Sequence, residues 1–526
     1  MGGISIPPRP SLAGRAALVL AMVALFYALT TALAFALIYL PCLVLRRVGL
    51  NPFNGELLIA SYASLALLFG LPLALTILLP LLPRSIALQS AGPLLTPTAQ
   101  PRLFAEIASI ARALGEPPPG AVYLISQPTA GVGHRGGLLG FGGQRVMALG
   151  LPLLSVLTVS ELRAVLAHEF GHYYAGDTRL ARRVHAVHSS ILRTLLATRS
   201  QAARRGQPTL ARWTLSLPPL VLGPYWRLFL RVTLRVSRQQ EFRADELACA
   251  LAGPAAFISA LRKLEAIQVM LPQFWIVHQG ILDAGCRVPL AASFARFMSH
   301  PKTPDRVSGV LNAPWRSFRN PDLGTHPPIA DRLAAAAAFS YPSPEEISAP
   351  AFSLVDDLDN LELDLLRLTF AKSKSAHLPI VPWDRVMLDV HLPRWRADVV
   401  RHSAALAEVT VDDLPRLSRD PRWLMNRIPD PPGILRSRHQ RWIHARGLLQ
   451  HALIVALVDR GWELHGVPGE FWLQLGERTL RLDHGPFGIL LGQRPPEDWM
   501  PLVESLGLAG LKLAPAPPQF PLGFSA

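Results

Sequence analysis

Two long runs of apolar residues dominate the N-terminal part of the chain. Neither 16–45 nor 57–83 contains a charged residue. A helix rises about 1.5 Å per residue, so about 20 apolar residues cross the roughly 30 Å hydrocarbon layer of a membrane. Buried core helices normally keep a polar face, and a cleaved signal peptide has a shorter apolar core. The pattern predicts an uncleaved transmembrane hairpin (about 16–45 and 57–83) in an N-terminal segment, 1–92.

After the hairpin the apolar residues change period. The apolar residues of 101–114 have the spacing of an amphipathic helix. The stretches "AVYLIS" (121–126) and "RVMAL" (145–149) are typical of strands. A glycine-rich stretch, 131–143, lies between these two strands and is expected to form a loop or hairpin. The sequence therefore predicts a small sheet preceded by a helix.

Two longer helices are predicted next. "TVSELRAVLAHEFGHYYAGD" opens with Thr158 and Glu161 in the spacing of a capping box and stops at Gly176. A second long helix is expected over 227–253. The uncharged run between them, 213–226, is broken by prolines and glycine and is too short to span a membrane. An interfacial or buried segment fits that run better.

The character of the chain changes after about residue 340. The stretch 340–350 resembles a linker, and the remainder combines a helix at about 435–460 with a hairpin-like segment, 471–482. The whole pattern predicts a mainly α-helical domain with a small sheet at 93–340. An appended α+β domain of unknown role is expected at 341–526.

The net charge of +15 is unevenly distributed, because 180–240 holds eleven arginines and no acidic residue. No nucleic-acid-binding motif accompanies this stretch, so nucleic acid is not expected as a partner. Attraction to anionic lipid of the cytoplasmic leaflet is the simpler explanation, and a solvated basic face is the alternative. The three cysteines do not suggest a disulfide framework. The arginine-rich stretch and the lack of a disulfide framework both favour a cytoplasmic catalytic domain.

The predicted helix at 158–176 carries candidate metal-site chemistry. His168 and His172 are four residues apart and therefore share one helix face, where both imidazoles can bind one metal ion. Glu169 lies slightly around the helix and can reach a water molecule at that metal without being a ligand. Two histidines alone hold zinc poorly, so a third ligand is needed.

The second long helix offers that ligand in "SRQQEFRADELA" (237–248). Glu241 would complete a His-His-Glu site, and Asp245, one turn later, would accept an N–H from a zinc-bound histidine. The alternative is a charged helix face on which both acids pair with Arg238 and Arg243.

These motifs together resemble the HtpX and CAAX prenyl endopeptidase family of membrane gluzincins, metallopeptidase family 48. The resemblance rests on two spans, "HEFGH" with Asp177 five residues later, "EFRAD", and "GTHPPIADR" (324–332), and it covers about 95–335 and the hairpin. It implies an α+β gluzincin fold with one zinc ion per chain. The implied zinc ligands are His168, His172 and Glu241, with Glu169 as the catalytic base.

The resemblance also implies roles around these ligands. His326 would donate a hydrogen bond to the oxyanion, Arg332 would lie near the cleft, and Asp177 and Asp245 would support the ligands without binding zinc. "RVMAL" stands where the family's edge strand holds extended substrate. The chain departs from the family at "QPTAGV" (127–132), where relatives often carry an Asn-Ala-Phe-like motif.

The expected function is that of a membrane-anchored zinc endopeptidase of the bacterial inner membrane, acting on protein or peptide substrates in membrane-protein quality control or processing. A sensor-type gluzincin that cleaves one regulatory protein is an alternative, although the link at 46–56 is too short for an external sensor domain. A non-catalytic membrane scaffold, with its C-terminal domain as the working part, is the second alternative.

Overall fold

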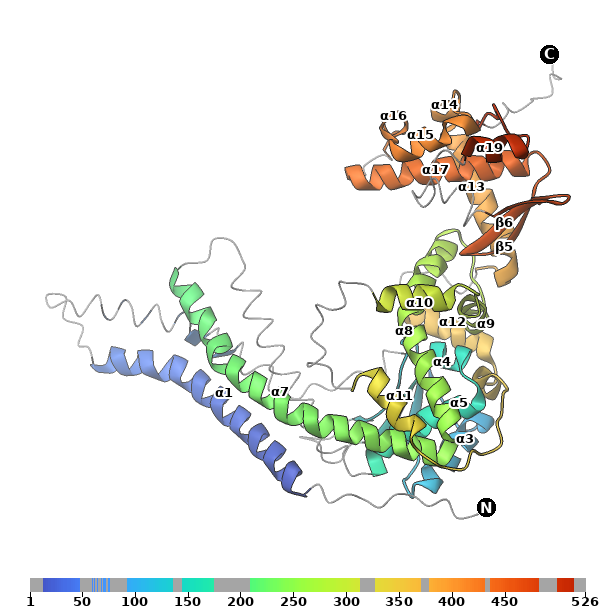
Figure 1. Ribbon diagram of the computed structural model, residues 1–526. Coiled ribbons are helices and arrows are strands. Elements are labelled where there is room, and N and C mark those ends of the chain that lie inside the picture. Colours follow the sequence, from blue (N-terminus) through green and yellow to red (C-terminus); the bar gives the residue numbers. More distant parts are fainter. Residues whose placement is uncertain are drawn as a thin grey trace. The chain divides into compact units, whose positions relative to one another are not determined.

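The chain divides into two compact units, and each is described by itself. The computed structural model describes residues 13–47, a few residues between 59 and 75, and 92–135, 144–174, 209–312, 327–369, 378–430, 436–481 and 499–514. One unit comprises Met1–Val269 and Pro304–Ala371, and the other comprises Met270–Thr303 and Lys372–Ala526. The described structure is mostly helical with small sheets, as expected (Figure 1).

The first unit holds the small sheet and the helices with the candidate metal ligands. Its described elements are α1 (Ala13–Arg47), β1 (Leu94–Leu95), α3 (Pro101–Ala113), β2 (Ala121–Ile125), β3 (Ala130–Arg135), β4 (Gln144–Gly150), α4 (Leu151–Val156), α5 (Val159–Tyr174), α7 (Thr209–Ala252), α10 (Thr303–Leu311), α11 (Ile329–Ala337), the 3₁₀ helix η5 (Ala351–Leu354) and α12 (Leu358–Thr369). Helix α8 (Pro254–Asp283) contributes to both units.

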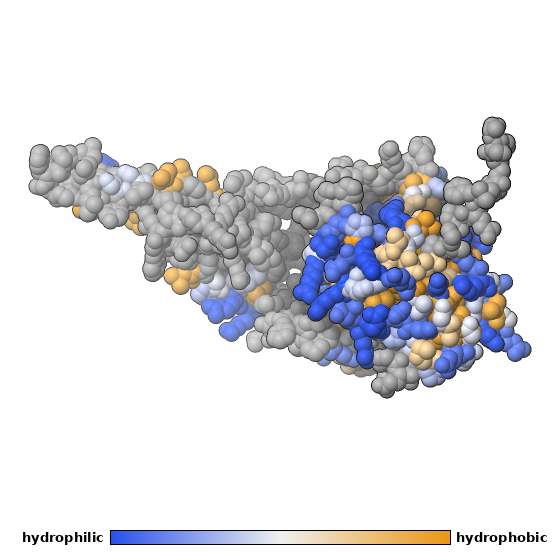
Figure 2. Space-filling view, turned by 90° about the horizontal axis from the view of Figure 1, so that it is seen from above, coloured by the Kyte–Doolittle hydropathy of each residue, from blue (hydrophilic) through white to orange (hydrophobic). Residues whose placement is uncertain are grey.

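Helix α1 is the part of the described chain best suited to a membrane. Its segment Leu20–Val44 has a mean hydropathy of 2.2, and it is the one helix among the described residues that is long and apolar enough to cross a bilayer. Figure 2 shows orange, hydrophobic surface on the part of the molecule that holds α1 and the first half of α7. Most of 57–83 lies outside the described residues, so the second span, the hairpin and its orientation stay predictions.

Helix α7 is longer than the sequence suggests. The expected break at 213–226 is wrong, because α7 runs without interruption from Thr209 to Ala252. Apolar packing on α1 explains part of this length: Tyr225 and Phe229 are buried against Met22 and Phe26. The Tyr225 hydroxyl also donates to the Met22 carbonyl at 2.6 Å. The first half of α7 therefore accompanies the candidate membrane helix (Figure 1).

The four-stranded sheet has the order β1-β2-β4-β3. Strand β4 pairs in parallel with β2 and antiparallel with β3, so the "RVMAL" strand is interior and its assignment as an edge strand is wrong. The glycine-rich stretch was expected as a loop or hairpin, and the hairpin alternative is confirmed: β3, from Ala130 to Arg135, pairs antiparallel with β4. Among the described residues, β1 and β3 are the two edge strands of the sheet, and β3 lies alongside α5.

The stretch 340–350 does not behave as a free linker. The amides of Val159 and Ser160, in the first turn of α5, donate to the carbonyls of Ala349 and Ile347 at 2.9 and 3.3 Å. The first amides of a helix have no acceptor within the helix, and this segment supplies acceptors for two of them. Residues 341–371 accordingly cluster with the first unit, while the domain boundary at 340–341 stays a prediction.

The second unit is built around one long buried helix. Its elements are α9 (Leu290–Met298), the 3₁₀ helix η7 (Trp383–Arg385), the π-helix η8 (Met387–His391), α13 (Leu392–Arg401), α14 (Ser403–Leu406), the 3₁₀ helix η9 (Val411–Asp413), α15 (Leu414–Arg419), α16 (Arg422–Met425), α17 (Arg438–Val458), β5 (Glu463–Val467), β6 (Glu470–Leu475), β7 (Arg478–Arg481) and α19 (Trp499–Ser505). Helix α17 and hairpin β6–β7 match the helix and hairpin that the sequence predicts. Leu448, Leu449 and Leu453 of α17 are buried in the core of this unit.

Candidate metal centre

The start of α5 is fixed by the capping box that the sequence predicts. The amide of Thr158 donates to Glu161 Oε2 at 2.7 Å, and the amide of Glu161 donates to Thr158 Oγ1 at 3.2 Å. Glu161 is buried and also accepts hydrogen bonds from Ser259 and Lys263 of α8, at 2.6 and 2.7 Å. One carboxylate therefore caps α5 and joins it to α8, which sets the direction of the helix that carries the histidines.

Helices α5 and α7 approach each other closely at Gly171. A Cβ added there would lie 3.0 Å from Ala244 Cα and 3.2 Å from Ala244 Cβ, tighter than almost all real contacts. Glycine removes this clash because it has no Cβ. The close approach brings the face of α5 that carries His168 and His172 against the face of α7 that carries Glu241.

The three proposed ligands converge in space. His168 Nε2 lies 3.6 Å from Glu241 Oε2, and His172 Nε2 lies 3.8 Å from Glu241 Oε1. One donor atom of each residue lies within 4.8 Å of the other two. Zinc bonds of about 2.0–2.1 Å at tetrahedral angles place neighbouring ligands about 3.3 Å apart, so the observed spacing needs little adjustment.

Asp245 lies behind the ligands and is fully buried. Its Oδ1 is 2.9 Å from His168 Nδ1, and Arg332 donates to both carboxylate oxygens, at 2.6 and 2.9 Å. Burial alone raises the pKa of Asp245, but the hydrogen bonds from Arg332 and His168 outweigh it and hold its pKa below the usual value. At this distance an ionised Asp245 favours the His168 tautomer with its hydrogen on Nδ1, and that tautomer leaves the Nε2 lone pair facing Glu241.

Arg332, on α11, supports Asp245 in a way that the sequence did not predict. The resemblance placed Arg332 near the cleft, and the structure places its largely buried guanidinium on Asp245, 3.7 Å from Glu241 Oε2. The chemistry of Asp245 gave one signal that a further partner was needed, because a buried carboxylate accepts more hydrogen bonds than one imidazole can donate. The sequence separation of 87 residues concealed the partner.

Of the three remaining predicted site residues, the structure describes Glu169 alone. Glu169 lies on α5 beside His168 and is half-buried. His326 and Asp177 lie outside the described residues. Their roles, like that of Glu169, stay predictions.

A second group of similar composition lies in the C-terminal unit. Asp398, His402 and His444 bring one donor atom each within 4.8 Å of one another. However, Arg436 Nη1 lies 2.7 Å from His444 Nδ1. A guanidinium only donates, so Nδ1 must accept, and the ring hydrogen is then on Nε2, the atom facing Asp398. This tautomer is the opposite of that at His168, so the second group suits a metal poorly.

Comparison of the sequence with known protein families concerns the group formed by His168, His172 and Glu241. Residues 97–313, which include His168, His172 and Glu241, match the family model of Peptidase family M48. Over these residues the chain is similar to this peptidase family. The resemblance that the motifs indicated is thereby confirmed, although the match ends before "GTHPPIADR" (324–332).

Curated proteins named as HtpX proteases are similar to part of the chain. Protease HtpX of Pseudomonas syringae pv. syringae (strain B728a) is 31% identical over 175 residues, and Protease HtpX of Pseudomonas fluorescens (strain Pf0-1) is 33% identical over 175. A Protease HtpX homolog of Thiobacillus denitrificans (strain ATCC 25259 / T1) is 28% identical over 173 residues. The matched part is 31% of this chain and spans 57% of the length of each relative.

The close helix contact yields a testable prediction. Gly171→Val adds three carbons where one already clashes, so it should push α5 from α7 and separate the histidines from Glu241. We expect a destabilisation of about 1–3 kcal/mol, typical of overpacking, and a lower zinc content by mass spectrometry. Gly280→Val is the control, because no atom of the described residues lies within 4 Å of a Cβ added at Gly280. Unchanged zinc and stability in Gly171→Val would contradict this reading of the contact.

Proposed function

We propose that the chain is a membrane-anchored, zinc-dependent endopeptidase. The observation that carries this proposal is the convergence of one donor atom each of His168, His172 and Glu241 within 4.8 Å, inside the region similar to Peptidase family M48. The buried Asp245–Arg332 pair supports it, because the pair fixes the tautomer that a metal ligand needs.

The donor set fits zinc, which favours imidazole nitrogens and one carboxylate with a position left open. When bound, zinc supplies Lewis acidity to a water molecule and to the scissile carbonyl. Glu169 is the general base: it takes the proton from the attacking water and delivers it to the leaving amine. His326 donates a hydrogen bond to the oxyanion. His168, His172 and Glu241 hold the ion, and Asp245 keeps the His168 ring in its productive orientation.

The edge strand β3 is the proposed docking place for substrate. An extended peptide can add to a sheet by pairing with the backbone of an edge strand. Because β3 lies alongside α5, a peptide paired with it would pass the histidine-bearing helix. An extended or unfolded protein is the proposed substrate, and membrane-protein quality control or processing is the proposed role.

Casein hydrolysis by the full chain in neutral detergent tests the proposal. The purified protein should cleave casein, lose activity with 1,10-phenanthroline, and regain it as zinc approaches one equivalent per chain. The loss follows because general-base catalysis by Glu169 needs a water held at the metal. A zinc-loaded, folded protein that cleaves neither casein nor an unfolded membrane protein would favour the non-catalytic scaffold instead.

A further inference from the structure

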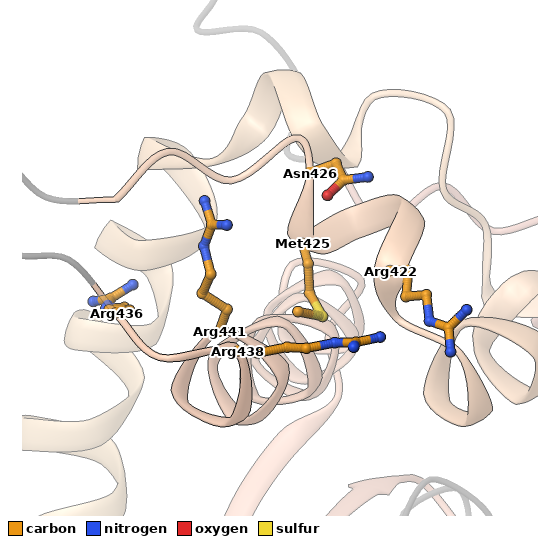
Figure 3. A pocket seen from close by; sticks show the side chains of 6 residues that line it. All are labelled: Arg422, Met425, Asn426, Arg436, Arg438 and Arg441. Carbon is orange, nitrogen blue, oxygen red and sulfur yellow. The ribbon is translucent and has the colours of Figure 1, made fainter.

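The C-terminal unit contains a pocket lined by arginines, far in sequence from the metal ligands. A cavity of about 360 Å³ lies between α16 and the start of α17 (Figure 3). It is lined by Arg422, Met425, Asn426, Arg436, Arg438 and Arg441. A neighbouring cavity of about 420 Å³ shares Arg422, Met425 and Arg438 with it and adds Arg419, Asp420 and Trp442. The two cavities together are called the arginine pocket below.

The arginine pocket carries more positive than negative charge. Asp420 lies 3.5 Å from Arg422, and Asp430 lies 3.3 Å from Arg441. Within the described part of the chain, no carboxylate lies within 4.0 Å of Arg419 or Arg438. Five guanidiniums therefore share two nearby carboxylates, and like charges around one cavity repel unless an anion lies between them.

The pocket lies at the N-terminus of α17, where positive charge is unfavourable. Helix α17 begins at Arg438, is capped by Ser437, and has no acidic residue in its first turn. The positive end of a helix dipole disfavours cations, so Arg438 and Arg441 stand where basic residues are least favourable. A bound anion would relieve both the mutual repulsion and the unfavourable dipole.

Several of the lining groups are held in place by neighbours. Arg436 donates to His444 Nδ1 at 2.7 Å, and Arg441 Nε donates to Asp430 at 3.3 Å. Met425 is buried and is part of the unit's core. Figure 3 shows Arg438 extending beneath Met425 toward Arg422, and the side chains of Arg422 and Arg438 are both exposed. The pocket lining thus combines the buried Met425 with exposed guanidiniums.

We infer that the arginine pocket binds a phosphate group. A guanidinium presents parallel N–H donors that match two oxygens of one phosphate, and several arginines around one cavity can each take a different oxygen. The Asn426 side chain adds a further amide donor at the wall. The phosphate can belong to a free phosphate compound or to the headgroup of an anionic lipid, since both present the same oxygens.

Isothermal titration of the full chain in neutral detergent tests this inference with two probes. The probes are inorganic phosphate and short-chain dihexanoyl phosphatidylglycerol below its micelle concentration, with the zwitterionic phosphatidylcholine analogue as reference. The double variant Arg422→Gln/Arg438→Gln should bind the preferred probe at least tenfold more weakly than wild type. Arg460→Gln is the matched control: it removes the same charge beyond the far end of α17, about 30 Å from the pocket by helix rise, and should change binding less than twofold.

The outcomes separate the two sources and expose failure. Pocket-dependent binding of inorganic phosphate that equals or exceeds that of the lipid assigns a soluble phosphate compound. Pocket-dependent binding of phosphatidylglycerol, with little binding of free phosphate, assigns a lipid headgroup. The inference is overturned if neither probe binds, if the double variant binds as wild type does, or if Arg460→Gln weakens binding equally. The variants replace exposed side chains, and an unchanged unfolding temperature would verify that they fold.

Discussion

Glu169→Gln is expected to leave zinc bound and to remove most of the turnover. The substitution keeps the size of the side chain but removes the carboxylate that accepts the proton of the attacking water. General-base catalysis is worth about 10²–10⁴-fold, so the rate of casein hydrolysis should fall by at least that factor. His168, His172 and Glu241 are unchanged, and zinc measured by mass spectrometry should stay near one per chain.

Glu246→Gln provides the matched control for this experiment. Glu246 lies on α7 one residue after Asp245, but it pairs with Arg243 and with the Tyr341 hydroxyl rather than with the histidines. It should therefore retain both zinc and activity. If Glu169→Gln hydrolysed casein as fast as Glu246→Gln, another residue would have to be the general base.

Local sequence patterns predicted much of the site because helices impose a simple geometry. Thr158 and Glu161 form the expected capping box, and the spacing of four residues brings His168 and His172 to one helix face. The long helix that carries Glu241 was also expected. These features depend on residues three or four apart, which a regular helix places together in any context.

Features that depend on distant segments were not predictable in the same way. The pairing of Arg332 with Asp245 joins elements 87 residues apart, and no local period encodes it. The same applies to 347–349, which supplies acceptors for the first amides of α5. The sequence predicted a loop or hairpin where β3 lies but did not identify β3 as an edge strand, because glycine is depleted in strands and favours turns. Tertiary packing decided each of these cases.

Glu241→Ala is expected to lose zinc as well as activity, which separates it from Glu169→Gln. The substitution removes one of the three ligands proposed for the ion. It also leaves His168 and His172 facing a space where a carboxylate oxygen lay 3.6–3.8 Å away. His168→Ala and His172→Ala should behave alike, whereas Glu246→Ala on the same helix should keep its zinc. The measurement is zinc content by mass spectrometry on purified variants, together with casein hydrolysis.

Asp245→Ala should be intermediate between these variants. Asp245 orients His168 and pairs with Arg332 without being a ligand, and loss of such a supporting group lowers metal affinity or activity about 10- to 100-fold. The variant also leaves the Arg332 guanidinium buried without its carboxylate, so its unfolding temperature should fall as well. Zinc affinity is therefore expected to be highest in Glu169→Gln, lower in Asp245→Ala and lowest in Glu241→Ala. If Glu241→Ala held zinc as tightly as wild type, the third ligand would lie elsewhere, and Glu241 would be only part of a charged helix face.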